Sequence, residues 1–146
     1  MKKPPRILKT LLWVNELKEK QAREKFQKAR RALQELEEML AEISTRPKEL
    51  YDELPGRPLS GEELRLFSAQ IERLLEEKKR VEEILAQKKE EVERLRKEAV
   101  RLYQRRRMAE ILWQRAREHY LKELSFAELK EIEDQILSRR GEDEGL

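Results

Sequence analysis

Residues 45–61, TRPKELYDELPGRPLSG, decide which fold the rest of the chain can adopt. This stretch holds three of the five prolines and two of the four glycines in the 146 residues. Neither residue type occurs between Arg6 and Arg46 or between Glu62 and Arg140. Because proline and glycine interrupt helices, their gathering at one place predicts a single chain reversal between two long helical segments.

The composition favours long helices over a compact domain. Charged residues make up 45% of the chain and aromatic residues 5%, whereas a compact domain has about a quarter charged residues. Apolar residues still reach 38% and follow a regular pattern, which argues against disorder. The absence of cysteine excludes disulfides, thiolate nucleophiles and cysteine-based zinc sites. Uncharged runs do not exceed six residues, so no membrane span is predicted and we expect a cytoplasmic protein.

The stretch after the reversal carries a heptad pattern. From Leu64 onward, steps of three and four residues alternate, and 14 of the 17 positions reached are apolar or aromatic. A repeat of seven is the period of a seam between supercoiled helices. Ser60 and Glu63 form a capping box, which predicts a helix over residues 61–122. The positions are Leu64, Phe67, Ile71, Leu74, Lys78, Val81, Leu85, Lys88, Val92, Leu95, Ala99, Leu102, Arg106, Ala109, Trp113, Ala116 and Tyr120.

The stretch before the reversal predicts a helix over residues 6–46, ending there because Pro47 disfavours a helical residue before it. Its seam runs from Ala22 to Ile43. Upstream, the apolar residues Ile7, Leu11 and Val14 fit only if a four-residue stutter lies near Lys18. The members of the regular part are Ala22, Phe26, Ala29, Leu33, Leu36, Leu40 and Ile43.

These patterns predict an all-α fold, a long antiparallel two-helix coiled-coil hairpin with a short C-terminal helical extension, forming a single domain over residues 1–146. The bend covers residues 47–60, and residue i pairs with about residue 106 − i, so the chain after Arg106 overhangs. A second capping box, Ser125 with Glu128, predicts a separate helix over 125–140 with an apolar stripe, and 141–146 should be disordered. That stripe consists of Leu129, Ile132 and Ile136.

Charge is segregated along the chain. Residues 1–31 carry 11 Lys/Arg and 3 Glu, whereas residues 32–63 carry 3 Lys/Arg and 9 Asp/Glu. The predicted hairpin therefore has a basic end with both termini and an acidic end at the bend, a difference that can sort partners by end. The cations of the basic end are Lys2, Lys3, Arg6, Lys9, Arg101, Arg105, Arg106 and Arg107.

No pattern in the sequence predicts catalysis, a cofactor, a metal or a small-molecule substrate, because a two-helix hairpin offers no enclosed pocket. His119 has no metal-ligand partner at helical spacing and is read as a solvated helix position. The run from Arg105 to Arg107 leaves nucleic-acid binding open as a weaker alternative, since the acidic segments would repel phosphates. A structural adaptor that dimerises through the overhang, where Trp113 and Tyr120 fall, is a further alternative.

The stretch around Trp13, with lysines on both sides, has two readings. It could anchor to a membrane surface, as basic amphipathic helices with tryptophan do. It could instead pack on the long helix, with Trp13 at an exposed edge. We favour the packed reading.

The order of four motifs resembles the FliJ family, a small coiled-coil component of flagellar and related type III protein-export systems. The motifs are LKTLLWVNELKEKQA at 8–22, LEEMLAEI at 36–43 leading to Tyr51, LFSAQIERL at 66–74 and ELKEIEDQILSRR at 128–140. The last motif is similar to the family's closing Asp-Glu-apolar-Ala element, from which Gln135 and Leu137 depart.

The resemblance implies a non-enzymatic central stalk that couples an export ATPase to protein export. Its basic end, represented by Arg6, Lys9, Arg101, Arg105, Arg106 and Arg107, would bind the hexameric ATPase ring. A membrane export gate would contact the region near the bend, at Met39, Ile43, Tyr51, Phe67 and Ile71, although Phe67 and Ile71 are also seam positions. Export chaperones are further implied partners, and the protein would lie at the inner membrane through the export apparatus.

Overall fold

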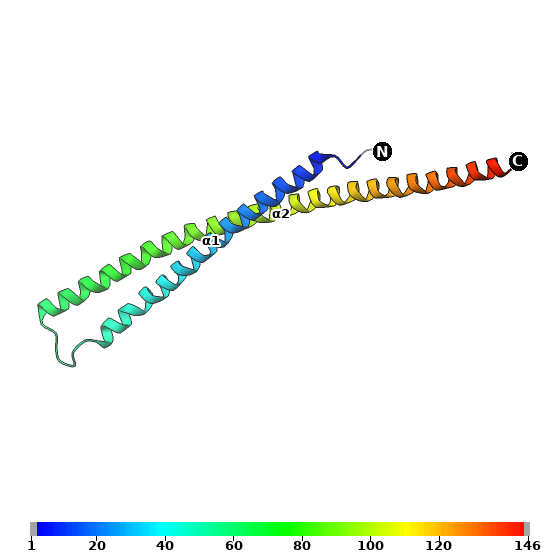
Figure 1. Ribbon diagram of the computed structural model, residues 1–146. Helices are drawn as coiled ribbons and strands as arrows, with labels where there is room; N and C mark the ends of the chain where they lie inside the picture. Colours follow the sequence, from blue (N-terminus) through cyan, green and yellow to red (C-terminus); the bar gives the residue numbers. More distant parts are fainter. Residues whose placement is uncertain (1–2, 145–146) are drawn as a thin grey trace. The chain divides into compact units, whose positions relative to one another are not determined.

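The computed structural model describes residues 3–144 and contains two helices within them. Helix α1 spans Arg6–Asp52 and helix α2 spans Gly61–Glu144, with residues 53–60 between them (Figure 1). The described residues contain no strand, and the helices pair antiparallel, which confirms the predicted all-α hairpin. Lys2, placed by the sequence in the basic end, and residues 145–146 lie outside the described part.

Contacts divide the chain into two units, each built from a piece of both helices. We call the residues up to Lys20 together with those from Arg101 onward the terminal unit, and Gln21–Val100 the loop unit. Within each unit, α1 packs on α2 along one apolar seam, since neither amphipathic helix can bury its stripe alone.

The predicted seam of α2 is confirmed. All of its positions are buried or half-buried except Leu64, which is exposed. The most buried side chains of this helix are all seam residues, which are Leu74, Val81 and Leu85 in the loop unit and Leu102 and Ala109 in the terminal unit. The seam tolerates Lys88 and Arg106 because carboxylates neutralise their charges. Glu91 lies 3.1 Å from Lys88, and Glu110 pairs with Arg106.

The seam of α1 runs without the predicted stutter. Its alternation of three and four residues continues upstream from Ala22 through four half-buried positions, whereas Ile7 and Leu11 are exposed. The prediction was wrong because it looked for apolar residues only. Two seam positions are polar, and each polar side chain has a partner within the fold. The side-chain amide of Asn15 donates to the carbonyl of Leu11 at 2.8 Å, and Glu19 pairs with Arg106. The four positions are Leu8, Leu12, Asn15 and Glu19.

Helix α1 passes through Pro47 instead of ending at Arg46. A proline inside a helix costs about 3 kcal/mol, through a lost hydrogen bond and a steric clash. Here Pro47 is half-buried on the seam, and Leu50 and Leu54 continue the same stripe, so packing of the additional turn offsets that cost. The loop is therefore shorter than the predicted bend of residues 47–60.

At the start of α2, half of the predicted capping box is present. The backbone N–H of Glu63 donates to Ser60 Oγ at 3.2 Å, which satisfies one of the free donors at the helix N-terminus. The second half would be a hydrogen bond from the backbone N–H of Ser60 to the Glu63 carboxylate. That carboxylate pairs instead with Arg57 of the loop at 3.1 Å. The predicted start at Gly61 is confirmed.

Helix α2 does not break near Leu124, and the predicted separate helix over 125–140 is its continuation. Residues 141–144, predicted to be disordered, are helical as well. The reason is that Ser125 and Glu128 favour a helix start without stopping a helix already present, and no proline or glycine lies between Glu62 and Arg140.

The predicted pairing of residue i with residue 106 − i was also wrong. In the terminal unit Glu19 contacts Arg106, not the region near residue 87. The extension of α1 to Asp52 moves the reversal later in the sequence, which accounts for part of the shift of this contact toward the C-terminus of α2. Arg106 therefore belongs to the paired region, and Trp113 and Tyr120 are half-buried instead of lying on a bare overhang.

Candidate partner-binding surfaces

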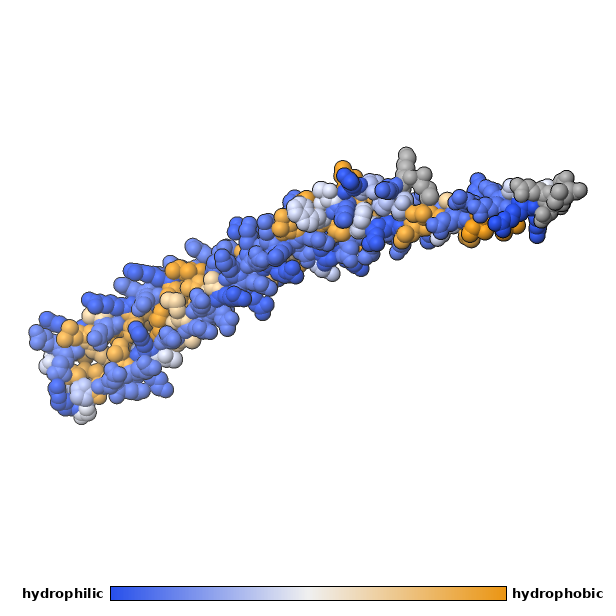
Figure 2. All heavy atoms as spheres, in the orientation of Figure 1, coloured by the Kyte–Doolittle hydropathy of each residue, from blue (hydrophilic) through white to orange (hydrophobic). Residues whose placement is uncertain are grey.

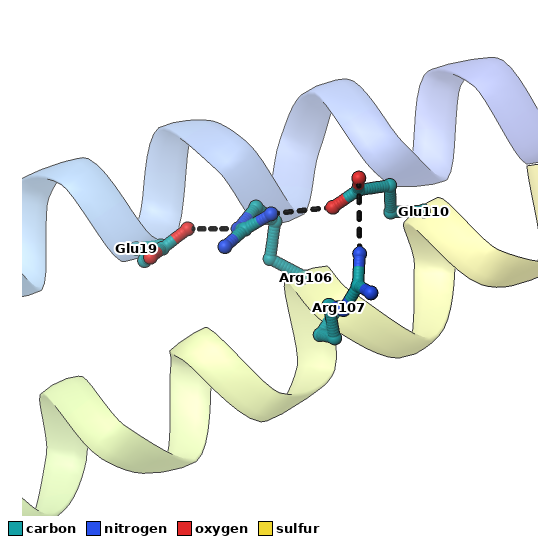
Figure 3. Close-up of polar contacts among 4 residues, drawn as sticks. All are labelled: Glu19, Arg106, Arg107 and Glu110. Atoms are coloured by element: carbon teal, nitrogen blue, oxygen red, sulfur yellow. Dashed lines mark hydrogen bonds and ion pairs between the residues drawn. The ribbon is translucent and has the colours of Figure 1, made fainter.

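Four charged side chains form a cluster between the helices of the terminal unit. Figure 3 shows Arg106 of α2 reaching toward Glu19 of α1 while also holding Glu110. Its Nε donates to Glu19 and its Nη1 donates to Glu110, both at 2.5 Å. Arg107 donates to the second oxygen of Glu110 at 3.2 Å. The Glu19 and Arg106 side chains retain only 12% and 23% of their exposure.

The charge of Arg106 is secured by its neighbours. Burial alone would lower the pKa of the guanidinium, but the Glu19 hydrogen bond and the charges of Glu19 and Glu110 outweigh it, so the net pKa is raised. The guanidinium carbon also lies 5.0 Å from the centre of the Tyr103 ring, a favourable cation–π contact. The arrangement links α1 and α2 through the ion pair between Glu19 and Arg106.

The predicted ATPase-binding cations all belong to the terminal unit but differ in their surroundings. Arg6, Lys9 and Arg105 are exposed. Arg101 is exposed at the surface, and Arg107 shares Glu110 with Arg106. Arg106 lies in the seam, where its charge is matched within the chain, so it offers little charge to a partner. Sequence reasoning missed Glu19, although counting three residues back from Ala22 places it on the seam.

The predicted gate-binding residues all belong to the loop unit. Tyr51 and Met39 are exposed, whereas Ile43 is buried in the core. Phe67 and Ile71 are half-buried on the seam, and the Phe67 ring packs against Tyr51 with centroids 6.3 Å apart and planes at 57°. Tyr51 and Met39 are therefore the two members of this set with the most surface to offer.

The C-terminal part of α2 leaves apolar side chains uncovered. From Glu128 to Gly141 every residue is exposed, including the predicted stripe, and apolar atoms reach the surface toward this end of α2 (Figure 2). The N-terminal Pro4 and Pro5 line a shallow groove of 790 Å³ together with Tyr120 and Phe126. The exposed apolar residues are Leu121, Phe126, Leu129, Ile132, Ile136 and Leu137.

Residues 3–144 contain neither a candidate metal site nor a candidate membrane span. No group of three metal-ligating side chains occurs there, and His119 pairs with Glu123 at 2.9 Å on an exposed helix face. Neither helix, over its described length, is both long and apolar enough to cross a membrane.

The chain was compared with known proteins at three levels. A family model described as "Flagellar FliJ protein" matches residues 5–142, which is nearly the whole chain. No curated protein and no solved structure gives a match. The chain therefore belongs to the FliJ family, and is a structural component of the flagellar export apparatus.

Proposed function

We propose that the protein is a central stalk and coupling component of the export apparatus, with the terminal unit binding the hexameric export ATPase and the loop unit binding the export gate. It performs no chemistry itself and transmits contact between a motor and a membrane channel, which places it at the inner membrane through its partners. The family match over residues 5–142 carries this proposal.

The exposed cations support ATPase binding by the terminal unit. Arg6, Lys9 and Arg105 are exposed there, and an acidic or polar ring interior would attract them over the Debye length of about 8 Å at physiological salt. The uncovered apolar side chains on α2 of the same unit add surface that a partner can bury. Charge would then guide the encounter, and apolar contact would hold the complex.

Reversing the three exposed cations tests this part of the proposal. We expect the Arg6→Glu, Lys9→Glu, Arg105→Glu variant to bind the cognate ATPase at least about tenfold more weakly and to lose its effect on ATP turnover, because steering becomes repulsion. Binding is measured by surface plasmon resonance and turnover by phosphate release. Helicity should not change, since none of the three side chains is buried.

The matched control reverses three exposed cations of the loop unit, Lys48, Arg65 and Arg80, and should leave ATPase binding within about twofold of the parent. Normal turnover with the terminal variant would remove these cations from the mechanism. Equal losses with both variants would mean that net charge alone, and not its position, governs binding.

Gate binding is tested at the two exposed members of the predicted set. We expect the Met39→Ala, Tyr51→Ala variant to bind the cytoplasmic domain of the gate at least about tenfold more weakly, because exposed aromatic and apolar anchors contribute most of the energy at an interface. Isothermal titration calorimetry measures the change. Ile43 is left intact, since its truncation would also destabilise the core.

The control for gate binding is the Leu75→Ala, Ile84→Ala variant, which removes two exposed apolar side chains from α2 of the same unit. It should bind the gate domain within about twofold of the parent. Unaltered affinity of the Met39→Ala, Tyr51→Ala variant would exclude these side chains as gate contacts.

A further inference from the structure

The N-terminal part of α1 exposes four large apolar side chains outside its seam. Leu8 and Leu12 face α2 and are half-buried, whereas four neighbours project elsewhere because each residue advances the helix by about 100°. This outer face is defined by Ile7, Leu11, Trp13 and Leu17, with exposed fractions of 74%, 44%, 63% and 44%. A patch of this kind on a charged helix marks a binding surface.

Cations surround the outer face and also lie within it. Five Lys/Arg residues between Lys3 and Lys20 are exposed. The acidic residues of the same stretch are Glu16 and Glu19, and Glu19 is neutralised by Arg106. The outer face therefore presents apolar and cationic groups together, with little opposing charge. The five cations are Lys3, Arg6, Lys9, Lys18 and Lys20.

The angular order of these side chains identifies the kind of partner. At about 100° per residue, Arg6 projects between Trp13 and Leu17, and Lys18 projects between Ile7 and Leu11. An apolar protein groove would have to strip water from both cations without matching their charge. A lipid surface offers phosphates at the depth of the charged groups, while apolar stems and rings enter the acyl boundary. Tryptophan favours this interfacial depth.

We propose that the outer face of α1 binds the surface of a bilayer that contains anionic lipids. Trp13 and Leu17 enter the boundary between headgroups and acyl chains, and the cations contact lipid phosphates. Arg6 and Lys9 are also candidates for ATPase binding, but the test of lipid binding needs only this chain and vesicles and changes neither residue. Failure of one proposal therefore leaves the other standing.

The test uses the full chain with Trp113→Phe, so that Trp13 is the remaining fluorophore. Vesicles of phosphatidylcholine with about 30% phosphatidylglycerol should shift the Trp13 emission to the blue and carry the protein into the pellet on centrifugation. Vesicles of phosphatidylcholine alone should do neither, and high salt should weaken binding. Binding that ignores lipid charge, or no binding at all, would overturn the proposal.

Two double variants test whether vesicle binding depends on the outer face or on any exposed apolar side chain of the protein. Trp13→Gln with Leu17→Gln should weaken co-sedimentation with anionic vesicles at least about tenfold. The control is Leu129→Gln with Leu137→Gln, which removes two exposed leucine side chains, 61% and 63% exposed, from the C-terminal part of α2, and it should stay within about twofold. An equal loss in both variants would overturn the assignment. So would a blue shift with soluble polyglutamate but not with anionic vesicles, which would assign the face to an acidic protein.

Discussion

Replacing Leu85 with aspartate is expected to lower the melting temperature by roughly 10 °C, a loss of about 3 kcal/mol of unfolding free energy. Leu85 lies on the seam of the loop unit and retains only 9% of its exposure. The substitution removes the burial of a leucine side chain, worth about 2 kcal/mol, and adds an unpaired carboxylate that must stay hydrated. Thermal unfolding followed by far-UV circular dichroism measures the change.

Leu75→Asp is the matched control, with the same substitution in the same helix and unit. Leu75 is 54% exposed, so its aspartate can stay in water, and we expect a change within about 0.5 kcal/mol. Similar melting temperatures for the Leu85→Asp variant and the parent would mean that Leu85 is not buried in solution and that the loop unit is not paired along this seam.

The fold could be predicted wherever the seam is apolar. On α2, Leu74, Val81 and Leu85 repeat with little interruption, so the heptad period identifies the buried side from sequence alone. On α1, Asn15 and Glu19 look like surface residues, and the prediction therefore moved the stripe onto Ile7 and Leu11. Only the position of α2 in the fold shows that Glu19 pairs with a cation, Arg106, at the seam.

The pairing register depends on where α1 ends. That end could not be predicted because the helix-breaking tendency of Pro47 is balanced against the packing of the turn that contains it. A proline usually ends a helix, so the sequence placed the reversal directly after Arg46. The seam residues Pro47, Leu50 and Leu54 favour another turn of helix, and that packing term is not visible in local propensity. The later end of α1 accounts for part of the difference in register, and the contact between Glu19 and Arg106 places Arg106 in the paired region instead of on an overhang.

The sequence could predict where along the chain the candidate residues gather, but not which of their side chains are exposed. The sequence located the basic end correctly in the terminal unit, yet Arg105, Arg106 and Arg107 are equivalent in a charge count. In the fold they differ, because Arg105 is exposed, Arg106 is in the seam and Arg107 shares a carboxylate. The prediction that the stretch around Trp13 packs on α2 with Trp13 at an exposed edge is confirmed, since Leu8 and Leu12 are half-buried and Trp13 is 63% exposed.

Replacing Arg106 with leucine is expected to destabilise the terminal unit by about 2 kcal/mol, although leucine suits a seam position. The loss arises because Glu19 and Glu110 keep their charges in a partly buried place without the cation that neutralised them. Breaking a fully buried pair costs about 3–5 kcal/mol, and the remaining exposure of both side chains reduces that figure. Urea unfolding at neutral pH measures the free energy of unfolding of the variant and of the parent.

The double variant Glu19→Leu with Arg106→Leu should recover most of that loss, to within about 1 kcal/mol of the parent, because it leaves an apolar seam in place of an unpaired carboxylate. Arg107→Leu is the control: its guanidinium is 52% exposed and shares only Glu110, so a change within about 0.5 kcal/mol is expected. Simple additivity of the two leucine substitutions would show that Glu19 and Arg106 do not interact in solution. Recovery in the double variant would instead show that Glu19 and Arg106 are energetically coupled across the seam, because the cost of the single substitution is that of a carboxylate left without its cation.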